Sequence, residues 1–225
     1  MKYDDHFDLA CKKRNELWKS VGDLDDYVIA GAINPAFFGG PRWPSLRQAF
    51  LCIETPDLTI MATDGLSDPY DDFDTNPSNQ VYNGLGLELY MAAPRKQGGL
   101  TELMKSWELR IFQNLAQQVA SNPNIVSMLD EYTFLSISLF LDGLPESLVN
   151  DKGETGVLLG LKSKLVPDTL ELSLETIRLV NVTVLTPAEL AYIIADGGQG
   201  RIELAEKLMK VEHSEVVSMD RPSVV

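Results

Sequence analysis

The strongest constraint on the fold comes from residues 175–185, near the carboxyl end of the chain. Apolar side chains alternate onto both faces of this segment, with Val180, Val182 and Val184 on one face and Ile177, Leu179 and Leu185 on the other. A strand that is apolar on both faces lies inside a sheet with further layers on both sides. The sequence therefore predicts a central strand in a sheet that is covered on both faces.

Three-to-four spacing of apolar residues predicts amphipathic helices around this sheet. The first helix ends at Gly22, and Asn122-Pro123 ends the second. Thr186-Pro187-Ala188-Glu189 is typical of a capping box with proline at the first helical position. The predicted helices are 7–21, 100–120, 186–195 and 200–210. Trp107 lies in the middle of the second apolar stripe and is predicted to be buried.

Further strands complete the predicted sheet. They cover residues 47–53, 58–63, 85–91, 133–141, 155–162 and 175–185. In the third strand, apolar residues alternate with Gly86, Glu88 and Tyr90, which predicts a single core face. The order of the elements is typical of the α+β class. We expect a single α+β domain over residues 1–210, with a mixed, mostly antiparallel β-sheet flanked by α-helices, and a flexible C-terminal tail over residues 211–225.

Charge narrows the range of partners. The chain has 33 acidic and 19 basic residues, for a net charge of -14. Since binding to nucleic-acid phosphates needs a basic surface, we expect no nucleic-acid partner. No apolar run approaches the ~20 residues that cross a bilayer, so we expect no membrane partner. Cys11 and Cys52 form no CxxC pattern, and the acidic N-terminus is unlike a signal peptide. We therefore expect a cytoplasmic protein with reduced thiols.

The stretch ATDGLSDPYDDFD, residues 62–74, carries five aspartates. Asp72-x-Asp74-x-Asn76 matches the opening of a calcium-binding EF-hand loop. The sixth position of that loop is Pro77 instead of glycine, and the twelfth is Asn83 instead of glutamate, so we expect no metal. Two interpretations of the stretch remain: a solvated connection, or a recognition surface in which aromatic residues among the acids act as anchors.

The sequence also lacks the usual residue patterns of nucleophilic catalysis. His6 and His213, the only histidines, lie near opposite ends of the chain, where we expect them on the surface. No G-x-S-x-G occurs. Cys11 and Cys52 fall in apolar patterns that are typical of core thiols. We expect no cofactor and no enzymatic activity. The alternative is a carboxylate-dependent hydrolase, with or without a metal, because many carboxylate pairs can be drawn among the acids.

Four motifs, taken in order along residues 58–209, resemble the Suppressor of fused family. They are Ile60–Asp68 (IMATDGLSD), similar to the family's strand-to-loop GLSD signature; Gly84–Leu89 (GLGLEL), similar to its GFGFEL strand; Glu102-Leu103-Met104 with Phe112-Gln113, similar to the following helix; and Val184–Leu190 (VLTPAEL) with Gly198-Gln199-Gly200, similar to its T-x-E-L…NGQG ending. The chain resembles a bacterial single-domain member of this family.

The resemblance implies a non-enzymatic protein-binding domain. Animal members sequester a transcription factor by clamping a short extended peptide, and bacterial single-domain members are associated with toxin–immunity loci. The chain would then be an immunity-like or regulatory protein that sequesters a protein or peptide partner, such as a cognate toxin. No oligomeric state is predicted.

The peptide-contacting region of the animal proteins includes the GLSD strand and loop. Asp68 is the residue that the resemblance carries over to this chain, whereas Met61 departs from the aromatic residue of the animal proteins. The predicted partner-binding residues are Asp64, Gly65, Leu66, Ser67, Asp68, Tyr70, Asp71 and Asp72.

Overall fold

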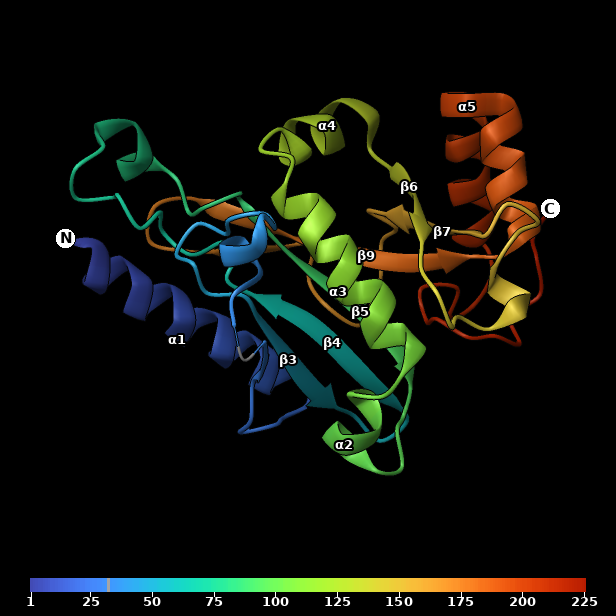
Figure 1. Ribbon diagram of the computed structural model, residues 1–225, viewed down its shortest axis with the longest axis horizontal. Helices are drawn as coiled ribbons and strands as arrows, with labels where there is room; N and C mark the ends of the chain where they lie inside the picture. The colour runs from blue at the N-terminus through green and yellow to red at the C-terminus, as the bar shows by residue number, and fades with distance from the viewer. Residues whose placement is uncertain (32) are drawn as a thin grey trace.

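A computed structural model describes residues 1–31 and 33–225. Within these residues, nine strands form one open sheet (Figure 1). The strands are β1 (Asp23–Leu24), β2 (Ile29–Ala30), β3 (Ala49–Glu54), β4 (Leu58–Asp64), β5 (Leu87–Pro94), β6 (Leu135–Phe140), β7 (Glu154–Leu159), β8 (Thr169–Glu171) and β9 (Thr176–Leu185). Their order is β1-β3-β4-β5-β9-β7-β6, with β2 also paired to β3 and β8 to β9.

Strand β9 joins the two halves of the sheet. Its first half runs parallel to β5, with Leu87 opposite Arg178, and its second half runs antiparallel to β7, with Val157 opposite Val184. The other described strand pairs are antiparallel. Both the mixed, mostly antiparallel sheet and the central position of the 175–185 strand are confirmed.

Helices cover both faces of the sheet. The α-helices are α1 (Tyr3–Val21), α2 (Gly99–Leu103), α3 (Trp107–Ala120), α4 (Ile125–Tyr132) and α5 (Pro187–Leu208), and short 3₁₀ helices are η1 (Pro35–Phe38), η2 (Pro77–Val81) and η3 (Glu146–Leu148). Phe112 of α3 packs in the same core as Val182 of β9. The alternate residues of β9 pack against other helices: Ile177 lies in a core with Trp18 of α1, and Leu185 in a core with Leu204 of α5. Since alternate residues of a strand point to opposite faces, α3 and α4 lie on one face and α1 and α5 on the other. The chain is a single α+β domain, as predicted.

The single helix predicted over residues 100–120 is wrong. A turn after α2 separates it from α3, which begins anew because the Ser106 side chain accepts a hydrogen bond from the Leu109 backbone N–H at 3.2 Å. Trp107 consequently lies in the first turn of α3 and is half-buried at the edge of the core, instead of largely buried as predicted. The residues that α3 buries completely include Ile111, Phe112 and Leu115.

Two burial predictions are also wrong. Strand β5 is buried on both faces instead of one, and Glu88 and Tyr90 have exposed fractions of 0% and 2%. His6 is buried rather than on the surface, since its ring packs against Phe73 with the centroids 5.0 Å apart and bonds to the Ser173 hydroxyl. Helix α1 covers the second face of β5, since Trp18 packs against Tyr90 and Arg14 lies beside Glu88, whereas Phe73 and Ser173 cover His6.

Other boundaries are confirmed. Helix α1 ends at Gly22, and the Thr186–Glu189 capping box begins α5. The two helices predicted after Thr186 meet inside α5 at a kink, because Gly197 has the non-helical angles φ 58° and ψ −130°. Within the described residues, no helix is both long and apolar enough to cross a bilayer.

The burial of α3 generates a stability prediction. Phe112→Ala should lower the free energy of unfolding by about 3–5 kcal/mol, because it leaves a cavity between α3 and the sheet. Trp107→Ala, at the half-buried edge, should lower it by less, about 1–3 kcal/mol. Urea unfolding of both variants, with the m-value followed as well, measures the difference. Equal losses would mean that the first turn of α3 is as deeply buried as its middle.

Candidate functional site

The acidic stretch of residues 62–74 divides into a buried and an exposed part. Strand β4 ends at Asp64, and residues 64–69 lie entirely inside the protein. Tyr70 is half-buried, and Asp71 and Asp72 are exposed. The stretch is therefore neither a fully solvated connection nor a fully exposed surface.

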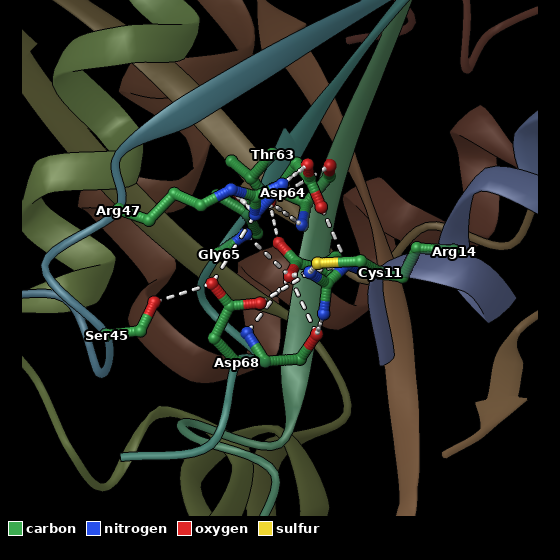
Figure 2. A network of polar contacts seen from close by, with 11 residues as sticks. Cys11, Arg14, Ser45, Arg47, Thr63, Asp64, Gly65 and Asp68 are labelled. Atoms are coloured by element: carbon green, nitrogen blue, oxygen red, sulfur yellow. Dashed lines mark hydrogen bonds and ion pairs between the residues drawn. The ribbon is translucent and has the colours of Figure 1, made fainter. Parts of the chain in front are cut away.

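Arg14 holds the buried part together from α1 (Figure 2). This side chain has an exposed fraction of 0%. Its Nε donates to Asp64 Oδ1 at 2.7 Å, and its Nη2 donates to Asp68 Oδ1 at 2.5 Å. Its Nη1 donates to the Ser67 hydroxyl at 3.0 Å. One guanidinium thus joins the N-terminal helix to three residues of the loop after β4.

Arg47 and Ser45, which precede β3, bind the same carboxylates from the other side (Figure 2). Arg47 forms an ion pair with Asp64 and donates to the Asp64 carbonyl at 3.0 Å. The second oxygen of Asp68 accepts from the Ser45 hydroxyl at 2.6 Å and lies 3.4 Å from Arg47 Nη1. Every carboxylate oxygen of Asp64 and Asp68 therefore has a donor within the protein.

Glu88, from β5, completes the cluster by bonding to residues 63–67. Its Oε1 accepts from the backbone N–H groups of Gly65 and Ser67 at 3.1 and 2.9 Å, and from the Ser67 hydroxyl at 2.7 Å. Its Oε2 lies 2.5 Å from the Thr63 hydroxyl, which also accepts from the Leu89 backbone N–H. The glutamate thereby satisfies backbone groups that the chain exposes as it leaves β4.

Gly65 is required at the point where the chain turns out of β4. Its φ is +144°, a conformation that favours glycine, and an added Cβ would lie 2.3 Å from the Arg47 carbonyl oxygen. The close approach of the two segments places Arg47 beside Asp64. A side chain at position 65 would separate the residues that the cluster joins.

Charge in this cluster is nearly balanced. Burial by itself would lower the pKa of Arg14, but the carboxylates of Asp64, Asp68 and Glu88 outweigh it and raise that pKa, so Arg14 stays charged. Burial raises the pKa of Glu88, against the opposing effect of Arg14. When Glu88 carries its proton, the two arginines balance the two aspartates.

Neither cysteine is activated as a nucleophile. Burial raises the pKa of the Cys11 thiol to about 11, although Arg14 lies nearby, and burial raises that of Cys52 to about 12. Only a thiolate is strongly nucleophilic, so both thiols are poorly reactive near neutral pH.

The exposed part of the stretch borders an open cavity of about 190 Å³. Its lining residues are Arg42, Trp43, Pro44, Tyr70, Asp71, Asp72 and Asn79. Asp71 pairs with the exposed Arg42, and its backbone N–H donates to the Pro44 carbonyl at 2.9 Å. Hydrogen bonds from Asn79 and Asn76 hold the Asp72 carboxylate and lower its pKa. Two carboxylates, each held by partners within the protein, therefore line the cavity.

The carboxylates of the buried part are poorly placed for hydrolysis or metal binding. Asp64, Asp68 and Glu88 are buried, and their oxygens are occupied by protein donors. Over residues 1–31 and 33–225, no group of three histidine, cysteine or acidic side chains has the arrangement of a metal site. In the EF-hand-like segment, the Asp72 carboxylate binds two asparagines and Asp74 accepts from the Tyr3 backbone N–H.

Sequence reasoning missed the residues that organise this site. Arg14, Arg47, Ser45 and Glu88 were not predicted to belong to it. A signal existed for Arg14, because it lies four residues from both Ala10 and Trp18, on the buried stripe of α1. A charged residue in such a stripe indicates a buried partner of opposite charge.

Comparisons of the sequence and the fold with known proteins identify the family of this chain. A sequence model of the Suppressor of fused protein (SUFU) matches residues 48–222. The fold is similar to that of a chain in the Sufu-Fu complex crystal structure, with a TM-score of 0.58 and 13% sequence identity over 97% of this chain and 92% of that chain. It is also similar to the crystal structure of Drosophila Suppressor of Fused, with a TM-score of 0.57 and 11% identity over 97% of this chain and 51% of that chain. No curated protein sequence matches this chain.

The family match covers most of the chain, including the whole of the 62–74 stretch. The chain belongs to the Suppressor of fused family. At 11% and 13% identity, the likeness to the two solved structures shows a shared fold. This chain spans about half of the Drosophila chain.

The buried cluster generates a second stability prediction. Arg14→Met should lower the free energy of unfolding by about 3–5 kcal/mol, because Asp64 and Asp68 would be left buried without their main counter-charge. Arg42→Met, which removes the exposed partner of Asp71, is the matched control and should change it by about 1 kcal/mol or less. Urea unfolding at neutral pH measures both. A small loss for Arg14→Met would show that the aspartates find other partners.

Glu88 generates a prediction of pH dependence. Because its pKa is raised in the folded state above the ordinary value of 4.5, its contribution to stability is complete below that value and is lost as pH rises through the folded-state pKa. Glu88→Gln keeps the shape of the protonated form and has no proton to lose. Its unfolding free energy relative to the unsubstituted protein should therefore increase as the pH rises above about 4.5. The exposed Glu16→Gln serves as the control, and a difference that stays constant with pH would exclude Glu88 as the titrating group.

Proposed function

We propose that this chain is a non-enzymatic binding domain that sequesters a protein or peptide partner through the exposed part of the acidic stretch. The observation that carries this proposal is the cavity bordered by Tyr70, Asp71 and Asp72, which stands on a rigid, fully bonded cluster. A preorganised surface binds without the entropic loss of ordering a loop. Acidic and aromatic groups around a small cavity suit a single basic side chain of a partner.

The predicted binding residues take two roles in this proposal. Asp64, Gly65, Leu66, Ser67 and Asp68 are buried and hold the shape of the loop. Tyr70, Asp71 and Asp72 face the partner. Direct contact between Asp68 and a partner would require the Arg14 and Ser45 bonds to open, so Asp68 acts by positioning the residues that follow it.

In the absence of a partner, Arg42 occupies the position in which the partner's basic side chain would pair with Asp71. It is a solvent-exposed cation that pairs with Asp71 at the edge of the cavity. A surface pair of this kind contributes little to stability and exchanges readily. A basic side chain of the partner can therefore displace it and gain the same carboxylate.

The overall charge favours the same class of partner. With a net charge of -14, the chain attracts a basic protein over distances comparable to the Debye length. We further propose that the protein is cytoplasmic and of bacterial origin, with residues 1–210 as the binding domain and residues 211–225 as a tail that Val217 and Arg221 fasten to it. Its role would be immunity-like or regulatory, with a cognate toxin as one such basic partner. The likeness to a Sufu chain in complex with Fu supports binding as the activity.

The hydrolase alternative is not favoured by the geometry. General acid–base chemistry needs a carboxylate within reach of a bound substrate. Asp64, Asp68 and Glu88 make their contacts inside the protein, and Asp72 is engaged by Asn76 and Asn79.

The test combines partner capture with kinetics. A pull-down from the source organism, read by mass spectrometry, identifies the bound protein. Association and dissociation rates are then measured at two ionic strengths for the double variant Asp71→Asn, Asp72→Asn. We expect association to slow by about tenfold at low salt and its salt dependence to weaken, because steering depends on the local field. Asp151→Asn, an exposed aspartate in a distant turn, is the charge control.

Arg42→Met gives the opposite expectation. Without Arg42, Asp71 is free to meet the partner, so association should become faster and dissociation slower, by a few-fold each. Unchanged kinetics in both the Asp71–Asp72 double variant and Arg42→Met would exclude this surface as the binding site.

A further inference from the structure

The chain that runs along one edge of β9 is interrupted. Strand β7 pairs with the second half of β9 and β8 with its first residues, and both run antiparallel to it. Next to the interruption, the Gly160 backbone N–H donates to the Asn181 carbonyl at 3.1 Å, and the Leu179 backbone N–H donates to the Asp168 carbonyl at 2.9 Å. Since backbone groups two residues apart point to the same edge of a strand, residues 161–167 leave the sheet between these two bonds.

A cavity of about 340 Å³ lies at this interruption. Its lining comes from the two flanks of the interruption, from residues 178–181 of β9 and from the end of α4. Leu129 of α4, Leu161 and Val180 are among its apolar lining residues, and their exposed fractions are 2%, 2% and 4%. Small-molecule sites typically have volumes of about 300–1,000 Å³, so this cavity has room for a small ligand with an apolar group.

Two ion pairs form the rim of the cavity. Arg178 of β9 pairs with Asp130 in the last turn of α4, and Lys162 Nζ lies 3.5 Å from Asp168 Oδ2. These four side chains line the cavity, and their exposed fractions lie between 38% and 77%. Exposed pairs of this kind contribute little to stability, so their members can exchange partners with a ligand.

Asn181 supplies a buried donor that the protein leaves unused. The residue lines the cavity and is 1% exposed. Its Oδ1 accepts from the Thr183 hydroxyl at 2.8 Å, whereas its Nδ2 has no hydrogen bond of normal geometry within the described part of the chain. The Tyr90 hydroxyl is nearby, and burial raises its pKa to about 12 against the opposing effects of Ser163 and Asn181. A buried donor without a partner is unfavourable, so a ligand oxygen that accepts from it gains free energy of binding.

We propose that this cavity binds a small zwitterion with an apolar side chain, and that its ligand is a free α-amino acid. Arg178 binds the carboxylate, Asp130 accepts from the ammonium group, and the leucine and valine side chains surround the apolar group. Asn181 Nδ2 donates to a carboxylate oxygen of the ligand. The site is separate from the acidic stretch and does not rest on the function proposed for that stretch.

Charge balance selects a zwitterion over an ion of either sign. A ligand that carries both charges can enter between Arg178 and Asp130 and give each of them a new partner. An anion would leave Asp130 without its cation, and a cation would leave Arg178 without its anion. The last turn of α4 also favours a positive charge, because its carbonyl groups form the negative end of the helix dipole.

Calorimetric titration of the full chain with L-leucine, L-methionine and L-phenylalanine tests the proposal. We expect saturable binding of at least one of them, with the largest NMR shift changes at the Gly160 and Val180 amides and at the Asn181 side chain. Arg178→Met and Asp130→Asn should each weaken this binding by about tenfold or more, since each removes the partner of one ligand charge. Both positions lie at the surface, where substitutions change stability little.

Matched controls separate recognition of the zwitterion from general effects. For the amino acid that binds best, the matching acid without the ammonium group and the matching amine without the carboxylate (isocaproate and isoamylamine for leucine) should each bind about tenfold more weakly or worse. Glycine, which lacks an apolar side chain, should also bind more weakly. Arg95→Met removes an ion pair with Glu54 elsewhere on the sheet and should leave binding unchanged.

Three results would overturn the proposal. The first is that none of the three amino acids binds at millimolar concentrations. The second is that the acid or the amine binds as tightly as the amino acid, because a zwitterion is then not what the site selects. The third is that Arg178→Met and Asp130→Asn both bind like the unsubstituted protein, or that the shift changes lie away from Gly160, Val180 and Asn181, because the ligand then occupies another site.

Discussion

A single buried guanidinium, that of Arg14, is the interaction on which the candidate site depends. It joins helix α1 to the loop after β4 through Asp64, Ser67 and Asp68, in a place that water does not reach. A buried charge is tolerated only when it is paired and bonded on all sides. The burial of Arg14 therefore requires the carboxylates to turn inward, and this inward turn gives the loop its shape.

The same constraint explains why the exposed aspartates are fixed in position. Asp68 binds Ser45 as well as Arg14, so it ties the segment before β3 to the loop, and the Asp71 backbone bonds to Pro44 in that segment. Tyr70, Asp71 and Asp72 thus project from a base that is bonded on both sides. Burial and exposure within one acidic stretch have separate consequences: the buried acids fix the shape of the loop, and the exposed acids place negative charge on the surface.

Central strand β9 organises the sheet next to this cluster, because Leu179 of β9 pairs with Glu88. By pairing with β5 in its first half and β7 in its second, it joins the two parts of the sheet and leaves the end of the β5 edge uncovered. Val216 and Val217 cover this edge, and Arg221 fastens their segment to Glu189. Unpaired strand edges readily pair with other chains, so a segment that covers this edge protects it.

The sequence by itself determined the α+β class, the central strand, the capping box of α5 and the family, because these follow from patterns among near neighbours and from short motifs. It did not reveal that Arg14 and Arg47 pair with Asp64 and Asp68, or that Glu88 accepts from the Gly65 and Ser67 backbone. The arginines, the glutamate and the loop after β4 come from four separate segments and meet only in the folded chain. Alternation along β5 suggested one open face, and only the packing of α1 showed that Glu88 lies in the interior. Tertiary structure decided which aspartates are buried, because burial of a charge depends on partners that are distant in the sequence.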